Sequence, residues 1–341
     1  MRLSAFGTIL VRILSVIITI YLAITLIFVL IRVVPGDPVA ILLGGEATGE
    51  MIETYRHELG FDQPLQIQYV RFWQDLLAGK FGISLMTKRD ALQDILTYFP
   101  ASLELCLVAI LGFGFVGGIL LGVLSSLRKN KFMDAFSNLF SITSISLPQF
   151  FIGLLLQLVF GLTLMWLPIT GRVGIDLFPP TKITGLYVLD SILTLNTVAL
   201  VSSITHLILP AITLGLAPLA QTATVVRGRM IEESMKDYIQ QCRACGLPNR
   251  LIVFKYMLKN AISPAITMIG ISFGWGLGFA FVVETVFAWP GMCRYAAEAT
   301  VYKDFSPVIA TTFVMIIVYI TINLILDLIR SYLDPRIRYG V

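Results

Sequence analysis

Long runs of uncharged, mostly apolar residues recur along this chain, and they limit the folds that it can adopt more than any other feature. Six such runs cover residues 13–31, 105–127, 135–171, 207–226, 261–283 and 306–326. A helix needs about 20 apolar residues to cross the hydrocarbon core of a membrane. In addition, only 13% of the residues are charged, whereas a soluble domain has roughly a quarter. The sequence therefore predicts an all-α membrane protein that crosses the bilayer several times.

The positions of the basic residues indicate how many times the chain crosses the membrane. The run 135–171 is too long for one crossing and barely long enough for two. Seven Lys and Arg residues lie in 227–259 and three more crowd 128–131, whereas 172–205 holds only two. Basic residues concentrate in cytoplasmic connections, so 135–171 should contribute a single crossing, near 148–167 and after a shorter helix. We therefore expect six transmembrane helices with both termini in the cytoplasm.

This topology places residues 34–99 outside the membrane, between the first and second spans. Apolar residues recur there at helical spacing, namely Met51, Ile52, Tyr55 and Leu59, and then Leu92, Ile95, Leu96 and Phe99. We expect a small helical periplasmic insert here, and a second external loop with short elements at 168–205. The expected organisation is thus the N-terminus with the first helix (1–33), the insert (34–99) and a core domain that holds the remaining spans (100–341).

A polar segment at 229–260 joins the fourth and fifth spans on the cytoplasmic side. It reads Asp-Tyr-Ile-Gln-Gln-Cys-Arg-Ala-Cys-Gly-Leu over 237–247, and Lys-Asn-Ala follows at 259–261. A polar helix, a glycine that can adopt a positive φ and a second helix leading into a span would form a helix–turn–helix. Periodicity alone leaves an ordinary polar linker as an equal alternative.

Six further segments carry motifs in order along the chain. They read Arg-Val-Val-Pro-Gly-Asp-Pro (32–38), Leu-Gly-Phe-Asp-Gln-Pro-Leu (59–65), Phe-Gly-Ile-Ser (81–84), Pro-Ala-Ser-Leu-Glu-Leu (100–105), Glu-Thr-Val-Phe-Ala-Trp-Pro-Gly (284–291) and Leu-Asp-Pro-Arg-Ile (333–337). Together with 237–247, which resembles an EAA loop, they make the chain similar to ABC transporter permeases of the dipeptide/oligopeptide/nickel (peptide permease B-type) family. The chain departs from the family pattern at Gln241, Cys242, Cys245 and Cys293.

The resemblance implies the type I ABC importer permease fold and a set of partners. These are a homologous second permease subunit, two ABC ATPase subunits that bind ATP and Mg, a periplasmic or lipid-anchored solute-binding protein, and the lipid of a bacterial inner membrane. The chain would form half of a path for di- or oligopeptides, and nickel, metal chelates, opines or glutathione are alternative cargoes. The resemblance places the ATPase-coupling loop on Asp237, Tyr238, Arg243, Ala244, Gly246 and Leu247. Movement of the ATPase subunits would pass through this loop to the membrane helices.

Several other functions lack the residues that they need. The sequence holds no Gly-x-x-x-x-Gly-Lys-Ser/Thr loop, so we expect no ATP site in this chain, and no nucleophile–base pair, so we expect no catalytic site. Cys242 and Cys245 form a single Cys-x-x-Cys pair and His57 and His206 are the only histidines, which argues against a metal site. The net charge of +4 is too small to indicate nucleic acid. An ion-driven secondary transporter would show paired acids in mid-membrane, where these spans carry no charge.

A few residues in or near the spans are candidates for specific roles. Trp275 and Glu284 could line or gate a solute path, although Glu284, like Glu104, lies close to the outer interface, which favours a structural role. Asp327 and Arg330 have the spacing of an ion pair on a helix surface. Glycines that repeat every four residues predict close helix packing, and they are Gly118 and Gly122, and Gly270, Gly274 and Gly278.

Overall fold

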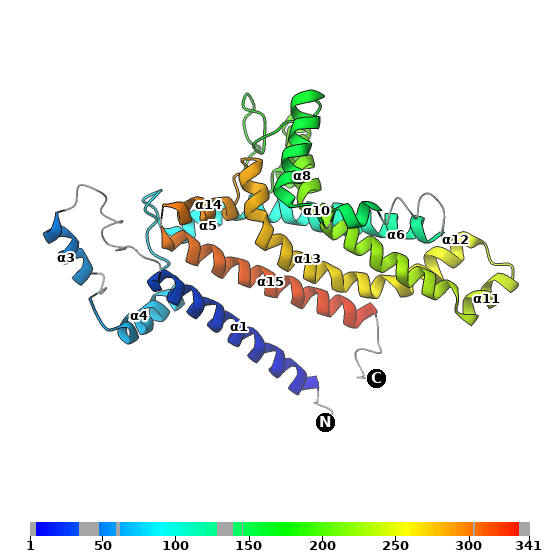
Figure 1. Ribbon diagram of the computed structural model, residues 1–341, viewed down its shortest axis with the longest axis horizontal. Helices are drawn as coiled ribbons and strands as arrows, with labels where there is room; N and C mark the ends of the chain where they lie inside the picture. The colour runs from blue at the N-terminus through cyan, green and yellow to red at the C-terminus, as the bar shows by residue number, and fades with distance from the viewer. Residues whose placement is uncertain are drawn as a thin grey trace. The chain divides into compact units, whose positions relative to one another are not determined.

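The computed structural model describes residues 5–33, 48–58, 62–127, 139–144, 146–302 and 304–333. The regular elements in these ranges are helices, apart from one isolated bridge between Ile83 and Asp90, which confirms the predicted all-α class. The helices, shown in Figure 1, are α1 (Ala5–Val33), α3 (Gly49–Glu58), α4 (Leu65–Leu77), α5 (Ala91–Cys106), η1 (Leu107–Gly117), α6 (Gly118–Leu127), α8 (Gln149–Leu156), η2 (Gln157–Thr163), α9 (Tyr187–Leu193), α10 (Thr197–Ser234), α11 (Asp237–Ala244), α12 (Asn249–Leu251), η3 (Ile252–Met257), α13 (Leu258–Val286), α14 (Met292–Val301) and α15 (Phe305–Leu333).

Apolar helices lie at each of the six runs identified in the sequence. Four are long and apolar enough to cross a membrane, namely Ala91–Leu127, Thr197–Ser234, Asn249–Val286 and Phe305–Arg330. Two shorter apolar stretches are Leu14–Val29 and Gln149–Thr163. A single apolar helix follows Pro148, and residues 139–144 before it are also helical, as predicted. The count of six crossings stays a prediction, because two of the stretches fall below the length of the other four.

Contacts between residues divide the chain into two compact units. The first comprises Met1–Phe99 and Tyr295–Val318, and the second comprises Pro100–Arg294 and Tyr319–Val341. In the first unit, aromatic rings join α4 to α1, because the ring of Phe28 lies 5.2 Å from the rings of both Tyr69 and Phe72. The three-part organisation expected from the sequence stays a prediction.

The segment expected to form an external insert, 34–99, is rich in helix where the structure describes it. It holds α3, α4 and the first part of α5. The turn before α5 is fixed by the buried carboxylate of Asp304, which accepts hydrogen bonds from Ser84 Oγ at 2.7 Å and from the Leu85 amide at 2.6 Å. Two of the positions used to predict these helices lie outside the described residues, namely Leu59 and the side chain of Tyr55.

In the second unit, α10 packs along η1, α6 and α13 (Figure 1). Glycines allow the close approach of α6: a Cβ atom at Gly118 would lie 2.6 Å from Thr222 Cβ, and one at Gly122 would lie 2.7 Å from the Ala223 carbonyl oxygen. The predicted packing role is confirmed for these two glycines. At Gly278 no described atom of this chain lies within 4 Å of a Cβ placed there, so close packing at that position stays a prediction.

The glycines on α13 face the part of α15 that belongs to the second unit, from Tyr319 onward. A Cβ atom at Gly270 would lie 2.7 Å from Asn323 Oδ1, and one at Gly274 would lie 3.0 Å from a tyrosine ring of α15. Close packing is therefore confirmed at these two positions. On α15 itself, Arg330 Nη1 lies 3.3 Å from Asp327 Oδ1, which confirms the predicted pair.

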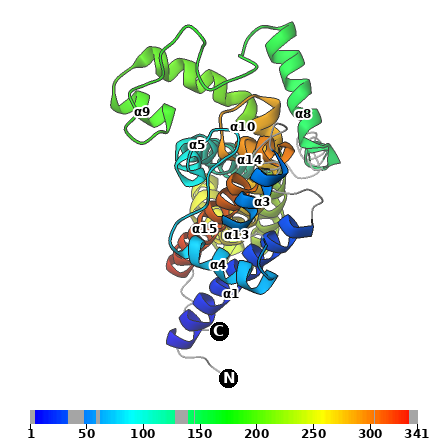
Figure 2. The same cartoon turned by 90° about the vertical axis from the view of Figure 1, so that its left-hand side faces the viewer.

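Two shorter elements of the second unit, α8 and α9, both contact α10 but lie apart from each other (Figure 2). The apolar helix α8 continues directly into η2. Helix α9 belongs to the stretch between η2 and α10, which is otherwise irregular. The loop with short elements that the sequence predicted at 168–205 is therefore present, although α10 already begins at Thr197.

Candidate functional site

The segment predicted to contact an ATPase subunit folds as a short helix, α11, followed by a turn. Cys245 closes the helix, and Gly246 follows with a φ of +73°, a conformation that glycine adopts without strain. The amides of Gly246 and Leu247 donate to the carbonyls of Arg243 and Cys242 at 3.0 and 3.2 Å. The predicted helix–turn–helix is therefore present, whereas its role in coupling stays a prediction.

The six residues predicted to form this coupling loop differ in exposure. Asp237, Arg243, Ala244 and Gly246 are exposed, whereas Tyr238 and Leu247 are half-buried. Ile239, for which the sequence predicted no role, is fully buried. It lies in an apolar cluster with Met230 of α10 and Val253 of η3, and the two half-buried residues pack against the same cluster. One face of α11 is thus anchored in the protein and the other is open.

A hydrogen-bond network lies behind α11. The Tyr238 hydroxyl donates to Glu233 Oε2 at 2.5 Å and accepts from Asn260 Nδ2 at 3.0 Å. Lys236 Nζ donates to Glu233 Oε1 at 2.5 Å. Burial and the hydrogen bond to the Glu233 carboxylate raise the pKa of the Tyr238 hydroxyl, so the hydroxyl remains a donor at neutral pH. The sequence predicted no partner for Asn260, which lies in the motif at 259–261, and no role for Glu233.

Trp275, one of the two candidates for a solute path, lies in the wall of a cavity of about 380 Å³. Its ring stacks on Phe279 with 5.9 Å between the centroids, and 63% of the residue is exposed. The wall comes from the segment that leads into α8, from the first residue of α8, and from α10 and α13, and every described residue in it is uncharged. Its hydroxyl and amide side chains are Ser144, Ser146, Gln149, Gln221 and Ser272, which can donate and accept hydrogen bonds without carrying charge.

Glu284, the other candidate, is fully buried and is not one of the residues that line this cavity. Its carboxylate accepts hydrogen bonds from Ser102 Oγ at 2.5 Å and from the Arg294 amide at 2.8 Å. A Cβ atom at Gly291 would lie 2.3 Å from the same carboxyl group. This geometry gives Glu284 a structural role at the turn that leads into α14, and a part in gating stays a prediction.

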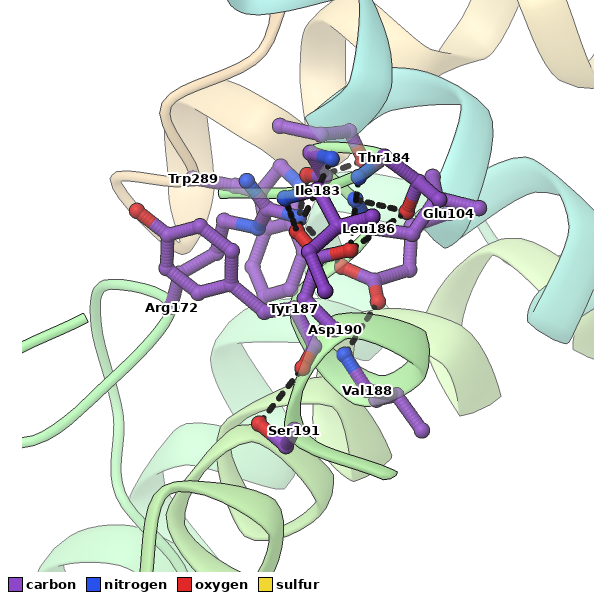
Figure 3. Close-up of polar contacts among 12 residues, drawn as sticks. Glu104, Arg172, Ile183, Thr184, Leu186, Tyr187, Val188, Asp190, Ser191 and Trp289 are labelled. Carbon is purple, nitrogen blue, oxygen red and sulfur yellow. Dashed lines mark hydrogen bonds and ion pairs between the residues drawn. The ribbon is translucent and has the colours of Figure 1, made fainter. Parts of the chain in front are cut away.

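A second buried acid, Glu104, holds the loop between η2 and α10 (Figure 3). Arg172 Nη2 lies 2.5 Å from Glu104 Oε2 and also donates to the Gly185 carbonyl at 2.9 Å. The guanidinium lies over the ring of Tyr187, 3.6 Å from its centroid. The other carboxylate oxygen, Glu104 Oε1, accepts from the Val188 amide at 2.8 Å. This confirms the structural role favoured for Glu104, whereas no motif or spacing in the sequence indicated Arg172.

Asp190, on α9, organises the same loop from the inside (Figure 3). Its carboxylate accepts hydrogen bonds from the Thr184 amide and hydroxyl at 2.8 and 2.7 Å, from the Gly185 amide at 2.9 Å and from the Ile183 amide at 3.3 Å. Burial acts to raise the pKa of Asp190, but these hydrogen bonds outweigh it and hold the pKa below its ordinary value. The loop is therefore built around two buried carboxylates, those of Glu104 and Asp190, which accept hydrogen bonds from backbone amides.

The cysteine and histidine residues considered as metal ligands are dispersed. Cys242 is half-buried and Cys245 is exposed, and His206 Nδ1 lies 2.8 Å from the Ser202 carbonyl oxygen of its own helix. In the ranges that the structure describes, no group of three or more His, Cys, Asp and Glu residues is placed to hold a metal ion.

Comparison with known proteins gives matches over almost the whole chain. Residues 118–339 match the family described as "Binding-protein-dependent transport system inner membrane component", and residues 6–106 match its N-terminal counterpart. The probable D,D-dipeptide transport system permease protein of Escherichia coli strain K12 is 40% identical over 313 residues, 92% of each chain. The dipeptide transport system permease protein of Alkalihalophilus pseudofirmus is 36% identical over 312 residues, 92% of this chain and 93% of its own length. The glutathione transport system permease protein of E. coli strain K12 is 31% identical over 328 residues, 96% of this chain and 97% of its own length.

These matches cover the N-terminal region, residues 237–247 and the helices that line the cavity. They agree with the order of motifs from 32–38 to 333–337. The chain therefore belongs to the family of inner membrane components of binding-protein-dependent (ABC) transport systems, as its motifs predicted.

Proposed function

We propose that this chain is one of two homologous permease subunits of a type I ABC importer, and that it forms half of a transmembrane path for di- or oligopeptides. Membership of the family supports the transport role, and the relatives named for dipeptide transport support the cargo class. The observation that carries the mechanism is α11, a helix that is anchored in the protein on one face and open on the other.

In this proposal the open face of α11 docks on one of two ATPase subunits, which bind the ATP and Mg. Asp237 and Arg243 lie at opposite ends of the helix and are both exposed, so their opposite charges can set the register of docking. Ala244 is small enough for close approach, and Gly246 supplies the turn. Closure of the ATPase subunits on ATP then displaces α11 and the helices to which it is attached. The permease itself performs no covalent chemistry.

We place the solute path at the cavity next to Trp275. Its hydroxyl and amide groups beside an indole ring can contact the peptide groups of a solute, whatever the charge of the solute's side chains. A bare metal ion would instead need imidazole, thiolate or carboxylate ligands, and none of the residues that line the cavity is of these types. The cavity therefore favours an amide-containing cargo.

Glutathione is a second candidate cargo, because one of the relatives is named for glutathione transport and glutathione also carries amide bonds. Uptake of nickel, metal chelates or opines is a further alternative that the family resemblance allows. The alternative of a different class is transport driven by an ion gradient. It would need charged side chains along the path, whereas the cavity wall is uncharged.

The proposal also fixes the orientation of the protein in the bacterial inner membrane. Both termini and α11 lie in the cytoplasm, where the basic connections of the chain are expected. A periplasmic or lipid-anchored solute-binding protein delivers cargo on the other side, to the insert at 34–99 and the outer loops.

Reconstitution of the chain with its partner subunits in proteoliposomes tests the proposal. We expect uptake of a labelled dipeptide, delivered by the binding protein, to require ATP and both ATPase subunits. Trp275→Ala should lower uptake while the complex assembles normally, and Asp237→Ala/Arg243→Ala should weaken co-purification of the ATPase subunits. Uptake by the chain without ATPase subunits, energised by an ion gradient alone, would show that the proposal is wrong.

A further inference from the structure

The two long helices that line the cavity also meet at α11. Helix α10 contributes Pro218 and Gln221 to the cavity wall, and α13 contributes Ser272 and Trp275. The last turn of α10 carries Glu233, and the first turn of α13 carries Asn260. Each of these residues lies about 18 Å along its helix from the cavity, at the usual rise per residue. The cavity wall and α11 are therefore opposite ends of the same two helices.

One side chain, that of Tyr238, joins the two helix ends to α11. Its hydroxyl is hydrogen-bonded to Glu233 at 2.5 Å and to Asn260 at 3.0 Å. We propose that this Tyr238 latch, made of Glu233, Tyr238 and Asn260, is the positioning device that makes α11 move as one body with the adjoining ends of α10 and α13. Displacement of α11 thereby becomes displacement of the cavity wall. The inference rests on the proposed docking of an ATPase subunit on α11.

The backbone on either side of α11 shows why a latch is needed. Before the helix, Met235 and Lys236 leave α10 and turn the chain, and after it Gly246 adopts a left-handed conformation. Helix α11 is therefore joined to its neighbours by non-helical residues at both ends. The apolar contacts of Ile239 hold it in place, but apolar burial is non-directional and would allow the helix to tilt or rotate. Hydrogen bonds to a carboxylate are directional and stronger than neutral ones.

The same geometry separates Tyr238 from the residues that would touch a partner. Tyr238 is half-buried and its hydroxyl points to α10 and α13, whereas its neighbour Asp237 is exposed. Lys236 occupies the other oxygen of the Glu233 carboxylate at 2.5 Å, so both oxygens of this nearly buried acid have a partner. Tyr238 is accordingly a positioning residue, and the exposed residues of α11 form the contact surface.

Removal of a single hydroxyl group tests the latch in the complete transporter. Tyr238→Phe keeps the ring in the apolar cluster and deletes both hydrogen bonds. Tyr256→Phe is the matched control, because Tyr256 packs against the same cluster and its hydroxyl has no hydrogen-bond partner among the described residues. Three quantities are measured: co-purification of the ATPase subunits, solute uptake per ATP hydrolysed, and hydrogen exchange of the α11 amides. A latch predicts that solute uptake per ATP and the protection of the α11 amides from exchange fall together.

We expect Tyr238→Phe to retain the ATPase subunits at the wild-type level. Uptake per ATP should fall by more than about 10-fold, because the variant loses two hydrogen bonds, one of them to a carboxylate, and the α11 amides should exchange faster by a similar factor. Tyr256→Phe should change none of the three. Asn260→Ala, at an exposed position, should act in the same direction as Tyr238→Phe, and the double variant should be no worse than the stronger single variant.

Two results would overturn the latch while leaving the proposed function intact. One is wild-type uptake per ATP, with wild-type exchange of α11, in an assembled Tyr238→Phe transporter. The other is a double variant whose losses are the full sum of the single losses, because independent residues do not form one device. Failure of the wild-type chain to retain ATPase subunits would instead overturn the docking site itself, and with it the latch.

Discussion

Removal of either partner of the Glu104–Arg172 ion pair is expected to release the loop between η2 and α10, which carries α9. The two charged side chains are 5% and 7% exposed, with 2.5 Å between Glu104 Oε2 and Arg172 Nη2. Arg172→Met would leave the Glu104 carboxylate buried with the Val188 amide but without a counter-charge. Loss of one partner of a buried pair costs about 3–5 kcal/mol. The guanidinium also lies 3.6 Å from the ring centroid of Tyr187, which adds roughly 0.5–2 kcal/mol.

Hydrogen exchange of the amides in 183–190, measured on the protein in lipid nanodiscs, reports this loss directly. The Val188 amide donates to Glu104 and the Gly185 carbonyl accepts from Arg172, so opening of the loop exposes both. A loss of about 3 kcal/mol corresponds to exchange that is faster by more than about 100-fold. Arg229→Met is the matched control, because Arg229 pairs with Glu232 on an exposed surface, where pairs contribute only about 0–1 kcal/mol.

A double variant separates the effect of charge from that of volume. Glu104→Gln/Arg172→Met leaves neither member of the pair charged, so the loop should recover most of the protection that each single variant loses. Exchange in Arg172→Met as slow as in the Arg229→Met control would refute the assigned role of the pair. A double variant as unprotected as the two single losses combined would show that packing of the long side chain, rather than the buried charge, holds the loop.

Three further predictions concern the turn after α11, the glycine contacts between helices, and Asp190 in the loop between η2 and α10. Gly246→Val should abolish uptake without affecting membrane insertion, since a branched residue at a φ of +73° costs about 1–3 kcal/mol; Gly246→Asn should be milder. Gly122→Ala should lower the melting temperature of the purified protein, because its Cβ would lie 2.7 Å from a carbonyl oxygen of α10, whereas Gly278→Ala should not. The lowered pKa of Asp190 means that its carboxylate stabilises the loop above the unfolded pKa of about 4. This stability should be lost as the pH falls below that value, and Asp190→Asn should remove the pH dependence of loop protection against proteolysis.

The sequence predicted those features that depend on local patterns. Hydropathy located the apolar helices, and the composition of 237–247 with its glycine predicted the helix and turn of α11. Glycine repeats predicted the contacts of Gly118 and Gly122 with α10. The repeat does not say which surface lies opposite each glycine, and at Gly278 no described atom of this chain lies within 4 Å of a Cβ placed there.

The features that the sequence did not reveal join residues that are distant along the chain. Arg172 meets Glu104 across 68 positions, and Tyr238 meets Asn260 across 22. Neither separation corresponds to the spacing of neighbours on one helix, which a sequence pattern could reveal. In addition, a lone Arg in a loop ordinarily remains in solvent. Tyr238 lies next to exposed Asp237, so the motif alone could not separate the residue that faces inward from the one that faces outward. That distinction required the positions of α10 and α13.

Helix contacts also connect α11, through α10 and α6, to the loop between η2 and α10. Helix α10 is in close contact with α6, since Gly118 and Gly122 leave no space for a Cβ atom between the two helices. Interlocked backbones of this kind cannot slide freely past each other, so α6 must follow α10 when α11 is displaced. Helix α6 continues without a break through η1 into the end of α5, where Glu104 holds Arg172. If α11 is displaced as proposed, the buried ion pair can carry that displacement into the loop between η2 and α10, and a transporter with Arg172→Met should hydrolyse ATP while this loop no longer follows the cycle.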